Sequence, residues 1–391
     1  MKKALIAAAV AGAFVAPTAM AAEGPSVNIY YPMAINIGDS DSTTNRSSTD
    51  NETVIDGGGS RLMFTWTDQL NNGTTLTAYA SFGNLGHTSR GAVQTRNSNL
   101  SLSGEFGTVA MGANEHFFEI DSIIDGYGAD WAAGGSPLYF QNIGRTGSAA
   151  AGAAAGTGIF SFARRDDNSV WWNSKDFNGV TLRAAYIFGP GATAGSAADP
   201  YGTQLGATYS SGAFSIKAAQ ATYHDYDASG TGASTVTATA AGANTVAGAP
   251  VAGSKATATQ FVASYDFGSF SVSGLVIDME QTNAGVVNAA GGAVTRLSVG
   301  GYGVNVTMPV AGGRVIFNMA ELQDQDETVA GVTGAVVDSG KSGFDIGYQH
   351  DFSANTYGFV RYDSTEQGVN YDNGQADSES DNIMLGLVFS Y

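Results

Sequence analysis

The feature of this sequence that most constrains its fold is the recurrence of apolar residues at every second position, along stretches of about ten residues. The two clearest examples stand at opposite ends of the chain. Their apolar positions are Val27, Ile29, Tyr31, Met33, Ile35 and Ile37 in one stretch, and Ile383, Leu385, Leu387, Phe389 and Tyr391 in the other. Side chains of a β-strand alternate between two faces, so this period predicts strands with one apolar face.

Short turn signals and long polar segments separate these stretches in alternation. Seven short turns are readable, at 70–73, 104–107, 175–179, 210–213, 266–269, 309–313 and 351–355. Eight longer segments rich in small and polar residues lie between the hairpins, at 38–59, 83–95, 113–167, 189–201, 224–257, 279–293, 322–342 and 363–380. The arrangement predicts an all-β fold of sixteen antiparallel strands, with both ends of the chain on the side of the short turns.

A sheet of this size is expected to close into a ring in which the last strand pairs with the first. Open edges would expose unpaired backbone groups, which are costly in hydrocarbon. Sixteen strands leave a bore too wide for side chains to fill, so an apolar inner face would enclose a wide hydrophobic cavity, which is unfavourable whether it is empty or filled with water. We therefore expect a transmembrane antiparallel 16-stranded β-barrel with lipid outside and water inside, short periplasmic turns and long extracellular loops.

Two places interrupt the period, and several tyrosines stand near strand ends. Pro32 removes a backbone donor inside the first strand, which predicts a bulge or a break there. Gly300 and Gly301 shift the phase of the apolar positions, which predicts another bulge. The tyrosines fit the aromatic girdles of a membrane barrel or ordinary half-buried positions, and they are Tyr79, Tyr186, Tyr209, Tyr265 and Tyr348.

Composition narrows the compartment and the partners. The leading MKK, the apolar run after it and the small residues up to Ala22 predict a secretory signal peptide over 1–21, followed by the barrel domain over 22–391. No later window offers the roughly 18 consecutive apolar residues of a spanning helix. Cysteine is absent, which excludes disulfides and thiolate metal sites. The formal net charge of −18 argues against nucleic acid as a partner, and no residue pattern calls for a cofactor.

Three stretches resemble segments of the general diffusion porins of Gram-negative outer membranes. They are LSGEFGTVAMG (102–112), DNSVWWNS (167–174) and LVFSY (387–391), and the resemblance extends over the whole mature chain. It implies a homotrimeric channel in the outer membrane, surrounded by lipid and lipopolysaccharide and open to small hydrophilic solutes and ions. It also implies that Leu387, Phe389 and Tyr391 form the signal read by the outer-membrane assembly machinery.

The same resemblance implies that the third long loop, 113–167, folds into the barrel and narrows it opposite a basic wall. The loop offers five acidic candidates for this constriction, namely Glu115, Glu119, Asp121, Asp125 and Asp130. Without the resemblance, these acids also fit a solvated loop at the mouth. The loop lacks the Pro-Glu-Phe-Gly-Gly segment frequent in the family, and Trp171 replaces a residue that is often polar or basic there.

Five basic residues are candidates for the pore wall. Arg61 and Arg96 match the basic wall of the family by position. Arg61 also precedes the outward-facing Leu62, so strand parity aims it inward. Arg96 shares its parity with Leu100, so only a bulge or a place above the apolar band would bring it to the lumen. The remaining candidates, inward by parity alone, are Arg183, Lys217 and Arg314.

These features favour an outer-membrane channel for passive diffusion, with a weak preference for cations because three or four carboxylates in the pore would lack a compensating base. A substrate-specific channel and a barrel-anchored adhesin remain alternatives, although anchoring would need only about eight strands. An enzyme is not expected, since only His116 has acidic neighbours and no nucleophile signature accompanies it. Short acidic runs such as DQDE (324–327) lack the spacing of a calcium site, so no metal site is expected.

Overall fold

The computed structural model describes residues 25–42, 51–55, 60–83, 85, 93–115, 117, 165–189, 200–225, 253–287, 293–329, 331–336, 339–368 and 378–391. These residues form nineteen strands in one sheet. The strands are β1 Ser26–Ser42, β2 Asn51–Ile55, β3 Arg61–Gln69, β4 Thr75–Gly83, β5 Gln94–Gly104, β6 Gly107–Glu115, β7 Arg165–Asn173, β8 Val180–Phe188, β9 Tyr201–Ser211, β10 Phe214–His224, β11 Lys255–Asp266, β12 Ser271–Val287, β13 Ala293–Val310, β14 Gly313–Leu322, β15 Gln325–Val329, β16 Val332–Val336, β17 Lys341–Ser353, β18 Thr356–Gln367 and β19 Ser378–Ser390.

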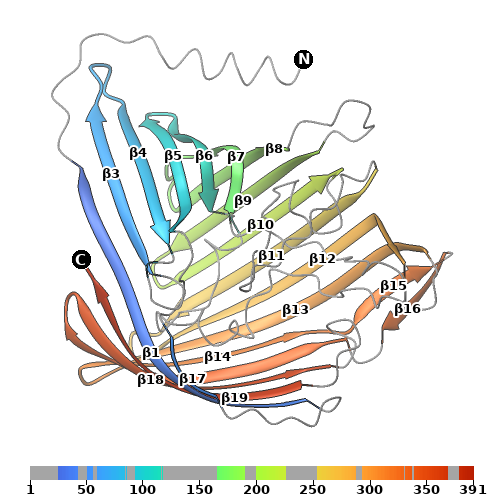
Figure 1. Ribbon diagram of the computed structural model, residues 1–391. Helices are drawn as coiled ribbons and strands as arrows, with labels where there is room; N and C mark the ends of the chain where they lie inside the picture. Colours follow the sequence, from blue (N-terminus) through green and yellow to red (C-terminus); the bar gives the residue numbers. More distant parts are fainter. Residues whose placement is uncertain are drawn as a thin grey trace.

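Sixteen of these strands form a closed antiparallel ring, as the sequence predicts. Consecutive ring strands pair in chain order, and β1 closes the ring by pairing with β3 on one edge and β19 on the other (Figure 1). At the seam, Ile29 and Tyr391 exchange backbone hydrogen bonds of 2.8 and 2.9 Å. All seven predicted short turns join neighbouring ring strands. The final strand therefore completes the barrel.

Three further strands lie in segments that the sequence predicts to be loops. β2 pairs with the second half of β1, while β15 and β16 form a hairpin that pairs with β13. In addition, β12 and β13 extend to Val287 and from Ala293, which shortens the loop expected over 279–293. These segments are rich in valine and threonine, which favour an extended backbone. Gly331, with φ of 82°, supplies the turn between β15 and β16.

The first strand is not broken at Pro32. Its register against β19 runs without a shift from Tyr30 to Ser42. Because Ile29 bonds to Tyr391, which directly follows β19, residues of the opposite parity, including Pro32, direct their backbone groups to the other edge. On that edge the pairing with β3 ends at Tyr30 and the pairing with β2 begins at Ala34. The missing donor thus falls where the neighbouring strand changes.

The bulge predicted at Gly300 and Gly301 is absent. The pairing of β12 with β13 runs without a shift through both glycines, and its irregularity lies instead between Thr282 and Val286. Consequently Val299 faces the inside of the barrel and Tyr302 the outside. The change of phase in the sequence reflects apolar residues on both faces of β13, not a change of register.

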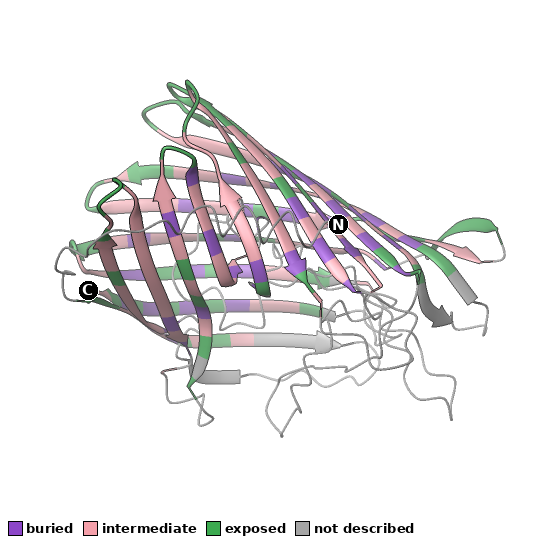
Figure 2. Ribbon diagram, turned by 90° about the horizontal axis from the view of Figure 1, so that it is seen from above, coloured by how far each residue is buried: buried purple, intermediate pink, exposed green. Residues whose placement is uncertain are grey.

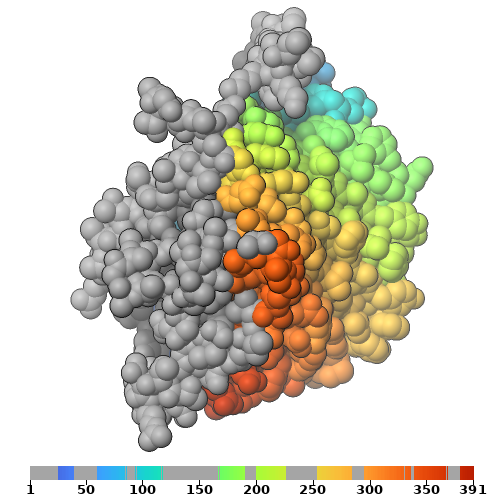
Figure 3. Space-filling view, turned by 90° about the vertical axis from the view of Figure 1, so that its right-hand side faces the viewer, coloured from blue at the N-terminus to red at the C-terminus, as the bar shows by residue number. Residues whose placement is uncertain are grey.

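The outward face of the ring is apolar and exposed. Exposed and buried positions alternate along single strands, and Figure 2 shows this as bands of different colour. Outward side chains with exposed fractions between 46% and 60% include Val27, Ile35, Leu205, Phe261, Val276, Leu385 and Leu387. Figure 3 shows one side of the molecule, where strands follow one another in chain order from green to red. Among the described residues, none belongs to a helix apolar and long enough to cross a bilayer.

Candidate functional site

Arg61 lies on the inner face of β3. It pairs with Tyr30 of β1, and its guanidinium carbon lies 5.0 Å from the centre of the Tyr30 ring. The residues of opposite parity, such as Phe64 and Trp66, stack on the outer face, with 5.8 Å between their ring centres. The cation is thus held against an aromatic ring on the lumen side of the β1–β3 strand pair.

Arg96 reaches the inner face through a β-bulge. The pairing of β4 with β5 shifts between Ala80 and Phe82, so Arg96 and Asn97 together stand opposite Ser81. A side-chain carbon on Gly83 would lie only 2.5 Å from the Cδ of Arg96, so the arginine side chain crosses the inner side of that glycine. Gly83 pairs with Arg61, and the two arginines are therefore neighbours on one wall.

The other three basic candidates also occupy inward positions. Arg183 pairs with Gly206, and Lys217 pairs with Thr208 on one side and Val262 on the other. Arg314 donates from Nε and Nη2 to Gln349 Oε1 at 3.3 and 3.2 Å. The five predicted wall bases therefore come from separate parts of the ring, with only Arg61 and Arg96 adjacent.

Of the five acidic candidates, only Glu115 lies within the described residues. It ends β6 and pairs with Arg165, after a bulge between Gly112 and Asn114. Asn114 faces inward, since its Nδ2 donates to Ser169 Oγ at 2.8 Å. Glu115 therefore takes an outward position in the wall, which does not fit the constriction expected for it. The remaining acids, Glu119, Asp121, Asp125 and Asp130, lie outside the described residues.

A row of polar side chains crosses six neighbouring strands on the inner face and was not predicted. Asn305 Nδ2 donates to Asn318 Oδ1 at 2.7 Å, and Asn318 Nδ2 donates to Asp345 Oδ1 at 2.9 Å. Arg361 Nη2 lies 3.9 Å from Asp345 Oδ2 and 3.4 Å from Asp363 Oδ1. One guanidinium thus bridges two carboxylates whose residues are directly paired.

The row continues across the seam that closes the barrel. Asn382 Nδ2 donates to Asp363 Oδ2 at 2.9 Å, and Asn36 Nδ2 donates to Asn382 Oδ1 at 3.2 Å. The Arg361 side chain is only 1% exposed, so its charge is compensated by paired carboxylates within the wall. We call the row from Asn305 to Asn36 the polar row.

Strand parity could have found these charges. Arg361 stands between Val360 and Tyr362, which are 45% and 36% exposed on the outer face. Asp345 likewise stands between Phe344 and Ile346. Strand parity therefore predicts that both charged side chains face inward. The contact between them depends on the register of β17 and β18, which the sequence does not reveal.

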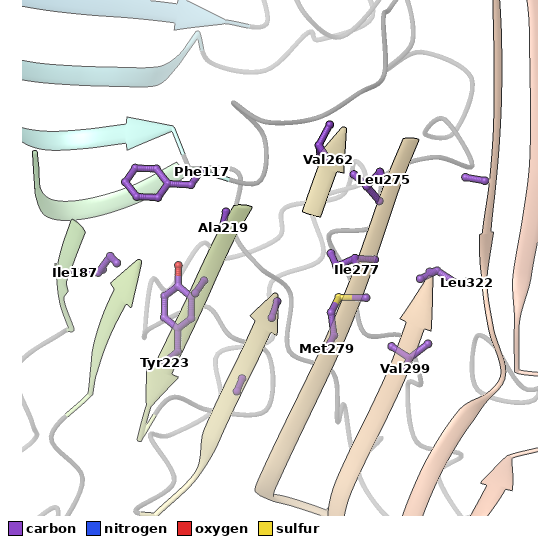
Figure 4. Packing of buried hydrophobic residues seen from close by; sticks show 14 residues of the cluster. Phe117, Ile187, Ala219, Tyr223, Val262, Leu275, Ile277, Met279, Val299 and Leu322 are labelled. Atoms are coloured by element: carbon purple, nitrogen blue, oxygen red, sulfur yellow. The ribbon is translucent and has the colours of Figure 1, made fainter. Parts of the chain in front are cut away.

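An apolar cluster covers the inner face of β8 to β14. Its fourteen members are between 0% and 6% exposed, and Figure 4 shows them projecting from neighbouring strands. They are Phe117, Ile187, Ala219, Ala221, Tyr223, Ala256, Ala258, Val262, Leu275, Ile277, Met279, Val299, Ala320 and Leu322. Phe117 alone among them comes from the long segment between β6 and β7. We call this set the apolar cluster.

Four of the five tyrosines noted in the sequence lie on the outer face. Tyr186 stacks on Tyr201 with 6.0 Å between ring centres, and Tyr265 lies 4.6 Å from Phe267 at a short turn. Tyr209 and Tyr348 also have outward parity. Tyr79 is the exception, because it pairs with Thr65 on the inner face. An aromatic ring near a strand end does not by itself reveal which side it faces.

At the short-turn end, two neighbouring hairpins are joined by an ion pair. The Lys175 ammonium contacts the Glu105 carboxylate, and this hydrogen bond and charge lower the pKa of Glu105. Both side chains are well exposed, so the pair adds little to stability.

Bases outnumber acids on the inner face of the ring strands, counting side chains that the structure describes. The seven bases are Arg61, Arg96, Arg183, Lys217, Arg314, Lys341 and Arg361. The five acids are Asp166, Asp266, Asp345, Asp351 and Asp363. No group of three or more potential metal ligands occurs in this part of the chain, and His116 lies outside it.

Comparison with known proteins places these features in a family. A family model described as Gram-negative porin matches residues 5–370. Among solved structures, the chain is similar to an anion-selective porin from Comamonas acidovorans, at 18% identity and a TM-score of 0.63, over 94% of this chain and 100% of that one. It is also similar to in-vitro folded OmpT, an outer membrane protein of Vibrio cholerae, at 14% identity and a TM-score of 0.61, over 96% and 100%.

The same Vibrio cholerae protein in a trimer form is similar at 14% identity and a TM-score of 0.58, over 94% of this chain and 100% of that one. At such identities the likeness concerns the fold. None of the curated proteins matches the chain.

Proposed function

Because the chain belongs to the family of Gram-negative porins and forms an outer-membrane channel, we propose that small hydrophilic solutes and ions pass through its bore by passive diffusion. The observation that carries this proposal is the division of the ring into an apolar, exposed outer face and an inner face that holds charged side chains. Lipid outside and water inside is the arrangement that such a division favours.

We propose a weak preference for anions, in place of the cation preference expected from the sequence. That expectation rested on loop acids, four of which lie outside the described residues while Glu115 faces outward. The described inner face carries seven bases against five acids. An excess of two charges, each worth on the order of 0.5 kcal/mol at about 8 Å in water, favours anions about fivefold before screening by salt. The anion-selective porin among similar structures supports the same direction.

Conductance in a planar lipid bilayer tests the channel. The purified protein should produce stepwise currents in potassium chloride that fall when sugars small enough to enter the bore are added. In a salt gradient, the reversal potential should have the sign of anion preference. No current at all would favour the anchored adhesin, and a current blocked at low concentration by a single solute would favour a substrate-specific channel.

We further propose that the protein assembles as a homotrimer after export with a signal peptide over 1–21, leaving the barrel domain over 22–391. The trimer form of a similar structure supports the oligomer. Leu387, Phe389 and Tyr391 are the proposed assembly signal, and their side chains are 44% to 74% exposed on the outer face. Tyr391→Asp should reduce insertion into the outer membrane while export continues, and normal amounts of folded, heat-modifiable protein would contradict this.

A further inference from the structure

A pocket of about 480 Å³ lies on the inner face of β1, β3 and β4, beside the turn between β17 and β18. Its volume falls in the range of small-molecule binding sites. Asn28 and Tyr30 of β1 line it, and they pair with Met63 and Arg61 of β3. Tyr79 of β4 completes this side of the lining. Because these residues share the inward parity of Arg61, the pocket belongs to the lumen side of the barrel.

The charge of the pocket is positive. Within the part of the chain that the structure describes, the Arg61 guanidinium forms no hydrogen bond and no ion pair, and it lies over the ring of Tyr30. Arg314 and Arg361 differ, because their guanidinium groups already bind an amide oxygen and two carboxylates. Arg96 adds a second positive charge at the neighbouring position of the wall. No acidic residue is among the described residues that line the pocket, so its charge favours an anion.

Neutral hydrogen-bond donors accompany this cation. The hydroxyl of Tyr79 and the side-chain amide of Asn28 are hydrogen-bonded to no other residue in the described ranges. The amide of Asn355, from the turn between β17 and β18, lines the same pocket. A carboxylate has two acceptor oxygens, which the planar fork of an arginine binds as a pair. The donors therefore favour a carboxylate over a spherical anion such as chloride.

Two tyrosine rings and a thioether supply the apolar part of the pocket. Tyr30 pairs with Arg61, and Tyr79 pairs with Thr65. Met63 stands between Arg61 and Thr65 on the same face of β3, so it forms a floor between the two rings. All three side chains are half-buried. Aromatic rings and a thioether sulfur attract a further aromatic ring, so the apolar part favours an aromatic ligand.

We propose that this pocket binds aromatic carboxylates, in which a carboxylate is joined to a benzene ring. The carboxylate lies at Arg61, and the ring lies over Met63 between Tyr30 and Tyr79. The inference rests on the proposed channel function for the route to the pocket, and it deepens that function by naming a class of solute that the inner wall retains. Arg61 binds the charge, and the tyrosines supply the preference over aliphatic carboxylates.

Isothermal titration calorimetry of the purified barrel in detergent tests the site, with sodium benzoate as the probe and sodium acetate as the comparison. Benzoate should bind about tenfold more tightly than acetate, because each tyrosine adds an aromatic contact. Arg61→Met should weaken benzoate binding about tenfold, through loss of the charged donor. The matched control is Arg296→Met, which removes the same charge from an ion pair with Glu280 on the outer face and should bind benzoate like the unaltered protein.

Two substitutions of Tyr79 separate the contribution of its ring from that of its hydroxyl. Tyr79→Phe keeps the ring, so benzoate should still bind about tenfold more tightly than acetate. Tyr79→Leu removes the ring and should reduce this preference to about threefold. Heat-modifiable migration identifies the folded variants. If Tyr79→Leu does not fold, the two probes on the unaltered protein and on Arg61→Met still decide the matter.

Equal affinities of the unaltered protein for benzoate and acetate would overturn the proposal. Equal affinities of Arg61→Met and Arg296→Met for benzoate would overturn it as well, and so would benzyl alcohol binding as tightly as benzoate. Failure of the channel proposal looks different, because a barrel that carries no current in a bilayer would still bind benzoate in detergent.

Discussion

The inner wall of β8 to β13 and the inner wall of β14 to β19 differ in chemistry, although both stand behind the same apolar outer face. The former carries most of the apolar cluster, built from residues such as Leu275, Ile277 and Met279. The latter carries most of the polar row, centred on Arg361 between Asp345 and Asp363. Lipid imposes one requirement on every outer face, whereas each inner face is free to specialise.

The difference corresponds to two structural tasks. The apolar cluster includes Phe117, so it holds the chain in place just beyond the end of β6. The polar row runs through Asn382 and Asn36, so it links the last strand to the first by side chains as well as by backbone. One part of the wall anchors Phe117, and the other reinforces the seam.

Removing one member of the polar row should lower the free energy of unfolding more than removing one member of the apolar cluster. Arg361→Met leaves Asp345 and Asp363 facing each other in the wall without their cation, which should cost about 3–5 kcal/mol. The measurement is urea unfolding of the protein in lipid vesicles. Arg314→Met is the control, because Arg314 donates to the neutral amide of Gln349. Equal stability of the two variants would remove the distinction between the parts of the wall.

The apolar cluster should respond through its packing. Met279→Ala opens a cavity at a fully buried position and should lower the free energy of unfolding by about 2–5 kcal/mol in the same assay. Val276→Ala on the same strand is the control, since Val276 is 53% exposed on the outer face and makes fewer protein contacts to lose. A larger fall in the free energy of unfolding for Val276→Ala than for Met279→Ala would mean that Val276, and not Met279, faces the inside of the barrel.

The boundary between the two parts should show the smallest effect. Asn305 ends the polar row beside the apolar cluster and makes a hydrogen bond of 2.7 Å to Asn318. Asn305→Leu extends the apolar wall by one residue but leaves Asn318 Oδ1 without this donor, at a cost of about 1–2 kcal/mol. Differential scanning calorimetry in detergent should show a modest fall in Tm, and a rise would mean that the boundary is not fixed by this bond.

The period-two pattern and the turn signals predicted the ring, because both are local properties of the backbone. They could not predict which apolar parity faces lipid where a strand is apolar on both faces. In β12, Leu275 and Ile277 alternate with Val276, and the pattern alone does not choose between them. The phase change at Gly300 was misread as a bulge for the same reason.

The candidate site was predictable in part. The inward positions of Arg61 and Arg314 follow from strand parity, and that of Arg96 follows from parity together with a β-bulge. The meeting of Arg361 with Asp345 depends on the register of the β17–β18 hairpin, and that of Asn36 with Asn382 depends on the register between the first and the last strand. No local pattern records such registers.

The central claim is that water lies inside the ring and lipid outside, and a cysteine scan of β3 tests it most directly. The chain has no cysteine, so each introduced thiol is the only one present. In lipid vesicles, a water-soluble thiol reagent that does not cross membranes should react at Met63→Cys, Thr65→Cys and Thr67→Cys. Leu62→Cys, Phe64→Cys and Trp66→Cys should be protected. Reaction in the opposite alternation, or equal reaction at all six positions, would contradict the account.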